Sequence, residues 1–99
     1  MRKLDFHDIS AAAPVHVLVV PKGEYVSFHD FMAKACAEEV AGFFSRVRMV
    51  AEKLGLTQDG YRLIMNHGFN GSQSVPHFHV HILGGKQLGG LLADDTLTR

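Results

Sequence analysis

Residues 77–82 alternate histidine with apolar side chains, and no other feature of the sequence constrains the fold as strongly. Every second position holds an imidazole: His77, His79 and His81. The positions between them hold the apolar side chains of Phe78, Val80 and Ile82. Successive side chains of a β-strand point to opposite faces, so a strand here would present imidazoles on one face and an apolar surface on the other. We therefore predict a strand over residues 75–83, with neighbouring imidazoles spaced by about 6.6–6.8 Å.

Three further segments have the patterns of strands. Residues 4–9 alternate apolar and polar side chains, which is typical of a half-buried strand. Residues 15–20 are almost entirely apolar and β-branched, interrupted only by His16, and predict a central strand covered on both faces. Residues 61–66 have the composition of another strand, whereas the residues from 86 onward are weakly patterned and are predicted to be irregular.

One long amphipathic helix is predicted over residues 36–54. Its apolar side chains recur at intervals of three and four positions: Cys36, Val40, Phe43, Val47, Val50 and Leu54. Gly55 suits the position that follows a helix C-terminus. Ser27 and Asp30 have the spacing of a capping box that opens an earlier helical turn. Because strands outnumber helices and short turns connect them, we predict an antiparallel α+β fold.

The chain has 99 residues, which is room for a single domain over residues 1–99. A domain of this size buries only about 60–65% of its unfolded surface, so pairing with a second copy would stabilise it. Ten basic and ten acidic side chains cancel, which argues against nucleic acid or an anionic membrane as a partner. The single cysteine, Cys36, the lack of a signal-peptide pattern and the short apolar runs predict a cytoplasmic protein.

A row of imidazoles on one strand face suits two kinds of chemistry. Three neutral imidazoles can complete a catalytic zinc site, or one imidazole can attack phosphorus while its neighbours orient it. Just before the row, residues 71–74 offer hydroxyls, an amide and accessible backbone N–H groups, which suit an anionic oxygen, and Asn66 could add a donor. No carboxylate or thiolate lies in this stretch. The sequence therefore favours phosphate chemistry without a metal or cofactor, with a metal-dependent site as the alternative.

Residues 77–83 resemble the histidine triad motif, His-x-His-x-His followed by two apolar residues. The wider segment 66–85, which has Gln73 and Ser74 before the motif and Gly84 and Gly85 after it, resembles the Hint branch of the histidine triad (HIT) superfamily, as do residues 6–22. The resemblance implies a HIT-like antiparallel sheet with one main helix, extended across a homodimer. It also implies hydrolysis of the P–N bond of purine nucleoside 5′-phosphoramidates of the AMP-amide type.

By this resemblance, His79 corresponds to the nucleophile that forms a covalent nucleotidyl-histidine intermediate. The resemblance implies supporting catalytic roles for four residues: His16, His77, His81 and Ser74, whose hydroxyl would lie near the leaving amine. It implies nucleotide-binding roles for six more residues. Asn66, Ser72 and Gln73 would contact the phosphate, Asp8 and Ile9 the ribose, and Phe6 together with Ile9 the purine base.

These roles are chemically consistent with one another. An imidazole with a pKa of about 6.5 is mostly neutral at pH 7, as a nucleophile must be. A carbonyl that accepts from one nitrogen of His79 would fix the tautomer that aims the other nitrogen at phosphorus. Donors from the loop and from His81 would stabilise the phosphoryl oxygens. Ser74 or a neighbouring imidazole could relay a proton to the leaving amine, and Asp8 can accept from both ribose hydroxyls.

The sequence also departs from the usual pattern of the family. Relatives begin with a helix and a first strand ahead of the segment that matches residues 4–9, whereas this chain starts almost directly at that strand, so we expect phosphate and ribose binding to exceed base selectivity. A Fhit-like dinucleoside polyphosphate hydrolase and a non-catalytic nucleotide-binding protein are the alternatives, and Gly84-Gly85 favours the Hint branch. Outside the motif, His29 is interpreted as a surface or capping residue, His67 as a loop residue that could rim the site, and Cys36 as a packing residue.

Overall fold

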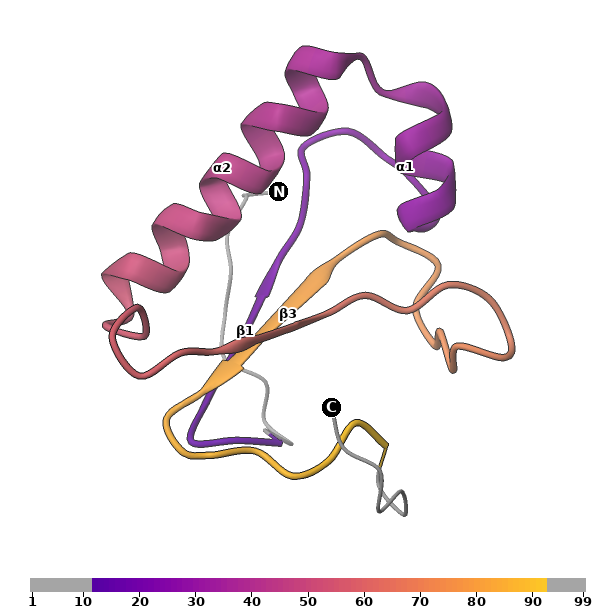
Figure 1. The fold of residues 1–99 in the computed structure, drawn as a ribbon. Helices are drawn as coiled ribbons and strands as arrows, with labels where there is room; N and C mark the ends of the chain where they lie inside the picture. The colour runs from indigo at the N-terminus through magenta and orange to yellow at the C-terminus, as the bar shows by residue number, and fades with distance from the viewer. Residues whose placement is uncertain (1–11, 93–99) are drawn as a thin grey trace.

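A computed structural model describes residues 12–92 and has an antiparallel three-stranded sheet with two helices, which is an α+β fold (Figure 1). The elements follow in the order β1 (Val15–Val19), α1 (Phe28–Lys34), α2 (Ala37–Lys53), β2 (Arg62–Ile64) and β3 (Val80–Gly84). The predicted strand at residues 4–9, and with it Phe6, Asp8 and Ile9, lies outside the described residues. No helix within the described part is long and apolar enough to cross a membrane.

Strand β3 forms the centre of the described sheet, and β1 and β2 pair with it on either side, both antiparallel. The register places Leu18 of β1 and Ile64 of β2 opposite His81. Within residues 12–92, β1 is therefore an edge strand, although the sequence predicted a central one. The segment predicted as a further strand, residues 4–9, lies outside that range.

Strand β3 begins at Val80, so the prediction of a strand over residues 75–83 is wrong for its first part, residues 75–79. The hydrogen bonds of this stretch explain the difference. Phe78 N–H donates to the carbonyl of Tyr25 at 2.7 Å, and His77 N–H donates to the carbonyl of Val75 at 2.8 Å. The segment is thus bonded to the chain before α1 and to itself, whereas a strand would bond to a neighbouring strand. Strand β2 is likewise shorter than the predicted range of 61–66.

Local signals set the limits of both helices. Ser27 is the N-cap of α1 and its Oγ accepts the N–H of Asp30 at 3.4 Å, as the capping-box spacing predicted. Helix α2 occupies nearly the whole predicted range, and Gly55 follows it with φ +76°, a left-handed conformation that favours glycine. Cys36 is extended and separates the two helices. Because it is the exposed N-cap of α2, before the first helical turn, its interpretation as a packing residue is wrong.

The hydrophobic core lies between the two helices and one face of the sheet (Figure 1). The alternating apolar residues of the histidine-bearing segment are all buried in it: Phe78, Val80 and Ile82. The ring of Phe78 stacks on Phe31 of α1, with 5.0 Å between centroids, and contacts Phe43 of α2 at 5.4 Å. Since Phe78 directly precedes His79, the packing of both helices holds the backbone that carries this imidazole.

Candidate active site

Three imidazoles form a continuous row beside the N-terminal end of β3. The ring centroids of His79 and His81 lie 4.9 Å apart, and those of His81 and His16 lie 5.1 Å apart. The sheet register brings His16 into the row because it lies opposite Leu83, two positions from His81 on the same face. The distance between the rings of His79 and His81 is shorter than the spacing of about 6.6–6.8 Å that was predicted for alternate residues of a strand, because His79 lies outside β3.

The tautomer of His79 follows from its backbone partner. Its Nδ1 lies 2.8 Å from the carbonyl oxygen of His77. A carbonyl can only accept, so Nδ1 carries a proton and donates it, and in the neutral ring Nε2 is left with an available lone pair. The carbonyl partner expected for His79 is therefore present, and it belongs to His77, whose own N–H is donated to Val75.

The other two imidazoles form a relay of hydrogen bonds. The N–H of Ala12 donates to His16 Nδ1 at 3.0 Å, which makes Nδ1 an acceptor and places the proton of the neutral ring on Nε2. That nitrogen lies 2.9 Å from His81 Nδ1 and therefore donates to it. Neutral His81 then carries its own proton on Nε2. The row thus combines a lone pair on His79 with a donor on His81, next to each other.

The loop of residues 66–73, which precedes the motif, is closed by side-chain amides. Asn66 Nδ2 donates to the carbonyl of Gly71 at 2.6 Å. The Oε1 atom of Gln73 accepts the N–H of Gly68 at 2.9 Å, and its Nε2 donates to the carbonyls of Val26 at 2.7 Å and Val75 at 3.0 Å. Both amides therefore shape the loop, and their predicted contacts to phosphate stay predictions.

The turn at residues 71–72 leaves little freedom to the backbone. A Cβ atom at Gly71 would lie 2.6 Å from the carbonyl oxygen of His67, a separation that real Cβ atoms do not show. Ser72 has φ 59°, a left-handed conformation that costs a non-glycine residue about 1–2 kcal/mol. Ser72 and Ser74 are both exposed, which leaves their hydroxyls accessible to a ligand.

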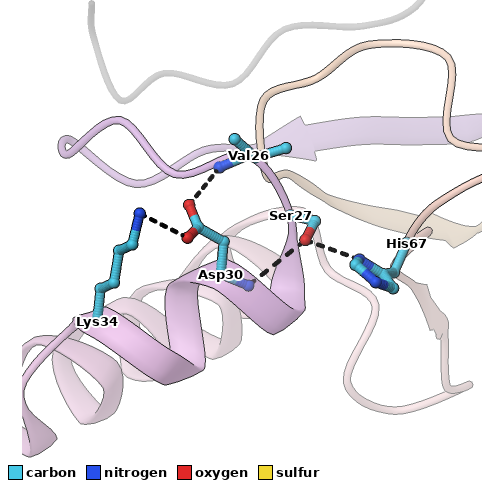
Figure 2. A network of polar contacts seen from close by, with 5 residues as sticks. All are labelled: Val26, Ser27, Asp30, Lys34 and His67. Carbon is cyan, nitrogen blue, oxygen red and sulfur yellow. Dashed lines mark hydrogen bonds and ion pairs between the residues drawn. The ribbon is translucent and has the colours of Figure 1, made fainter.

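The structure adds a contact that the sequence did not indicate (Figure 2). The Nδ1 atom of His67, in the loop, lies 2.8 Å from the buried Oγ of Ser27, the N-cap of α1. The two residues are separated by forty positions in the chain, so no local pattern joins them. Their individual interpretations, as a loop histidine and a helix cap, were correct but did not predict the pair.

Two carboxylates, of Asp30 and Glu39, stabilise the chain around Ser27. The carboxylate of Asp30 accepts the N–H of Val26 at 2.8 Å and pairs with Lys34 at 2.9 Å (Figure 2). The Val26 N–H first, and then Lys34, lower the pKa of Asp30 below its usual 3.8. The hydroxyl of Tyr25 donates to Glu39 of α2 at 2.9 Å, and this bond to a carboxylate raises the pKa of the tyrosine above 10.0.

Within residues 12–92, no group of three or more His, Cys, Asp or Glu side chains has an arrangement that could hold a metal ion. Four ring nitrogens of the row form hydrogen bonds with protein groups: both nitrogens of His16, and the Nδ1 atoms of His79 and His81. The arrangement instead offers one ring nitrogen lone pair beside hydrogen-bond donors. Such a site can attack an electrophilic phosphorus and stabilise the oxygens around it.

Comparison with known proteins finds a matching family, related sequences and similar solved structures. A family model described as HIT domain matches residues 2–88. A protein of Escherichia coli K12 described as purine nucleoside phosphoramidase is 43% identical over 89 residues, which are 89% of this chain and 73% of that protein. An uncharacterised HIT-like protein of Rickettsia prowazekii is 48% identical over 89 residues, 90% of this chain and 74% of that protein. The solved structure of a HIT family hydrolase from Clostridium thermocellum matches with a TM-score of 0.78 and 37% identity, covering 90% of this chain and 76% of that one.

Proposed function

The chain belongs to the HIT domain family, and we propose that it hydrolyses the P–N bond of purine nucleoside 5′-phosphoramidates through a covalent nucleotidyl-His79 intermediate. The observation that carries the proposal is the hydrogen bond from His79 Nδ1 to the His77 carbonyl, because it leaves Nε2 as the nucleophile. The substrate class is that named for the Escherichia coli relative.

In the first step of the proposed reaction, His79 Nε2 forms a bond to the α-phosphorus and the P–N bond breaks. The electron pair of the broken bond goes to the leaving amine, which takes up a proton relayed by Ser74. The Nε2–H of His81 donates to a phosphoryl oxygen as negative charge develops on it. His16 holds His81 in this tautomer through the bond of 2.9 Å.

In the second step, water attacks the same phosphorus, and the bond to His79 breaks with its electron pair returning to Nε2. The proton that the water releases replaces the one that the leaving amine took up. The products are a nucleoside monophosphate and the neutral imidazole, which regains its lone pair. Neither step uses a metal or a cofactor. The His77 carbonyl accepts from the same ring throughout and stabilises the positive charge that the imidazole carries in the intermediate.

We assign the nucleotide contacts as follows. An amide nitrogen carries two protons, so Asn66 can donate one to Gly71 and the other to phosphate. Gln73 would exchange its longer bond, to Val75, for a phosphate oxygen, and Ser72 would add a hydroxyl. The remaining contacts fall on residues outside the described range: Asp8 and Ile9 at the ribose, and Phe6 with Ile9 at the base.

We also propose that the enzyme acts as a homodimer in the cytoplasm, with the sheet continued across the two copies. Within the described residues, no strand pairs with the outer edge of β2. The apolar side chains Tyr61, Leu63 and Met65, at alternate positions along this edge, are 38–40% exposed. A second copy would cover both the unpaired backbone and these side chains. A free Cys36 fits a reducing compartment.

A cleavage assay with two substrates tests the proposal. The purified protein is incubated with adenosine 5′-phosphoramidate or with a diadenosine polyphosphate, with and without a chelator. We expect cleavage of the phosphoramidate that the chelator leaves unchanged and that His79→Ala lowers more than about a thousand-fold. His29→Ala, which removes a surface imidazole of α1, is the matched control and should retain the activity.

Three other outcomes of the assay would each contradict the proposal. Preference for the diadenosine compound would replace the proposal with a dinucleoside polyphosphate hydrolase. Nucleotide binding without turnover would replace it with a binding protein. Loss of activity on chelation would contradict the metal-free mechanism.

A further inference from the structure

Three consecutive residues, 25–27, are hydrogen-bonded to the segment that carries the proposed active site. The bonds run from Phe78 N–H to the Tyr25 carbonyl (2.7 Å), from Gln73 Nε2 to the Val26 carbonyl (2.7 Å) and between His67 Nδ1 and Ser27 Oγ (2.8 Å). The first two hold the residue before His79 and the end of the loop. The third holds the start of the loop, and the mechanism described above does not use it.

Ser27 is a fixed anchor for this third bond. Its side chain is buried, with 2% of the residue exposed, and its Oγ accepts the N–H of Asp30 as the cap of α1. The carboxylate of Asp30 in turn holds Val26 N–H, so the backbone on both sides of the cap is tied to the helix (Figure 2). A hydroxyl has two lone pairs and one proton, which is enough to bond Asp30 and His67 together.

His67 itself is exposed and takes no part in the hydrophobic core. Its ring has one further contact, a tilted arrangement with the ring of His29 at 5.3 Å between centroids. Because the side chain buries little apolar surface, its structural contribution is the bond to Ser27. That bond connects the loop to a helix that is packed on Phe78.

The restraint that the bond between His67 and Ser27 imposes reaches the proposed active site through the backbone of the loop. Gly68, the next residue, donates its N–H to Gln73 Oε1 at 2.9 Å and accepts the N–H of Gln73 at 3.0 Å. Fixing His67 therefore fixes Gly68, and Gly68 fixes Gln73 by two bonds. Ser74, the proposed proton relay, is the next residue in the chain.

We propose that His67 is a positioning residue of the active site, which acts through Ser27 to hold the loop of residues 66–73 so that Ser74 lies in register with His79. The inference rests on the proposed function for its kinetic consequence. Its structural part, the attachment of the loop to α1, is independent of the substrate.

The kinetic test compares His67→Ala, His67→Asn and the control His29→Ala. An asparagine amide reaches about as far as Nδ1 of histidine and can bond Ser27, whereas alanine cannot. We expect His67→Ala to lower kcat about tenfold with a smaller change in KM, and His67→Asn to restore most of the loss. In a double-mutant cycle with Ser27→Ala, the two losses should combine to less than their product, because both remove the same bond. His29→Ala removes the ring contact of His67 but leaves its bond to Ser27, so it should match the unmodified protein.

Hydrogen exchange of the loop amides tests the attachment without any substrate. The amides of Gly68 and Gly71 are both hydrogen-bonded inside the loop. Their hydrogens should therefore exchange faster in His67→Ala than in the unmodified protein or in His29→Ala. Unchanged exchange in a folded His67→Ala protein would overturn the proposal. So would kcat within twofold of the unmodified protein, or equal losses in the alanine and asparagine variants. If the unmodified protein fails to cleave phosphoramidates, the proposed function fails while the exchange experiment still decides the attachment.

Discussion

The orientation of His79 depends on a residue two positions before it. Its Nδ1 proton is donated to the carbonyl of His77, so the ring is held by the same short segment of backbone that carries it. A substitution of the His77 side chain would leave this carbonyl in place. The distant contribution comes from His16, which is brought to His81 by the pairing of β1 with β3 and fixes the second tautomer of the site.

The pKa of Asp30 predicts how acid affects the chain that supports the site. The Val26 N–H and then Lys34 lower the pKa of this carboxyl in the folded protein below 3.8, so the carboxylate contributes stability above pH 3.8 that is lost as the pH falls through the folded value. Asp30→Asn keeps the shape and removes the charge. It should therefore lower the free energy of unfolding at pH 7, and the difference from the unmodified protein should shrink at and below pH 3.8.

Urea unfolding at pH 7 and at pH 3 measures this difference. Asp59→Asn is the control, because Asp59 is exposed and makes no ion pair among the described residues. A difference between Asp30→Asn and the unmodified protein that is the same at both pH values would show that the charge of Asp30 does not contribute.

The elements of the fold differ in how far the sequence predicts them. Helix α2 was predicted closely because its signals, the apolar spacing and Gly55, are local. The start of β3 was predicted five positions too early, since it is set by a hydrogen bond from Phe78 to Tyr25, more than fifty residues away. Alternation alone cannot show which partner a backbone N–H will find.

The same distinction applies to the candidate site. The pair His79–His81 and a carbonyl partner for His79 could be predicted because the motif is a short-range feature. The third imidazole of the row is His16, where the sequence predicted His77, because the pairing of β1 with β3 brings it there. The engagement of Gln73 inside the loop and the bond between His67 and Ser27 could not, because both depend on where α1 packs. The motif is the basis of the proposed chemistry, whereas tertiary packing determines which residues hold the loop and the imidazoles in place.

The tight turn at Gly71 leads to a prediction about the loop. Gly71→Ala places a Cβ atom 2.6 Å from the backbone oxygen of His67, which cannot yield as a flexible side chain would. The loop must shift, so we expect a loss of about 1–3 kcal/mol in the free energy of unfolding and roughly tenfold lower activity. Thermal unfolding and the phosphoramidate assay measure the two effects.

Gly42→Ala is the matched control for this substitution. Gly42 lies in α2, and an added Cβ would meet no atom within 4 Å beyond the backbone of its own helix and its chain neighbours, so alanine should raise the stability by about 0.5–1 kcal/mol and leave activity unchanged. Full activity in Gly71→Ala would show that the proposed reaction does not need this loop conformation.

At the scale of the whole molecule, the two faces of the sheet have separate tasks. One face packs against both helices through a core that includes Phe31, Phe43 and Phe78. The other carries His16 and His81, with the row extended by His79. Because Phe78 and His79 are adjacent, the packing of both helices on Phe78 holds the backbone that carries His79. The described residues thus combine a hydrophobic core with a row of buried and half-buried imidazoles.

The central claim is that His79 Nε2 becomes bonded to phosphorus during turnover. The direct measurement mixes the protein with adenosine 5′-phosphoramidate, quenches the mixture in base, where a phosphorus–imidazole bond survives, and analyses the peptides by mass spectrometry. We predict that the peptide containing His79 transiently carries one adenosine monophosphate group, and that His79→Ala carries none. Cleavage without any such adduct in quenched samples, or an adduct on a different residue, would contradict the account.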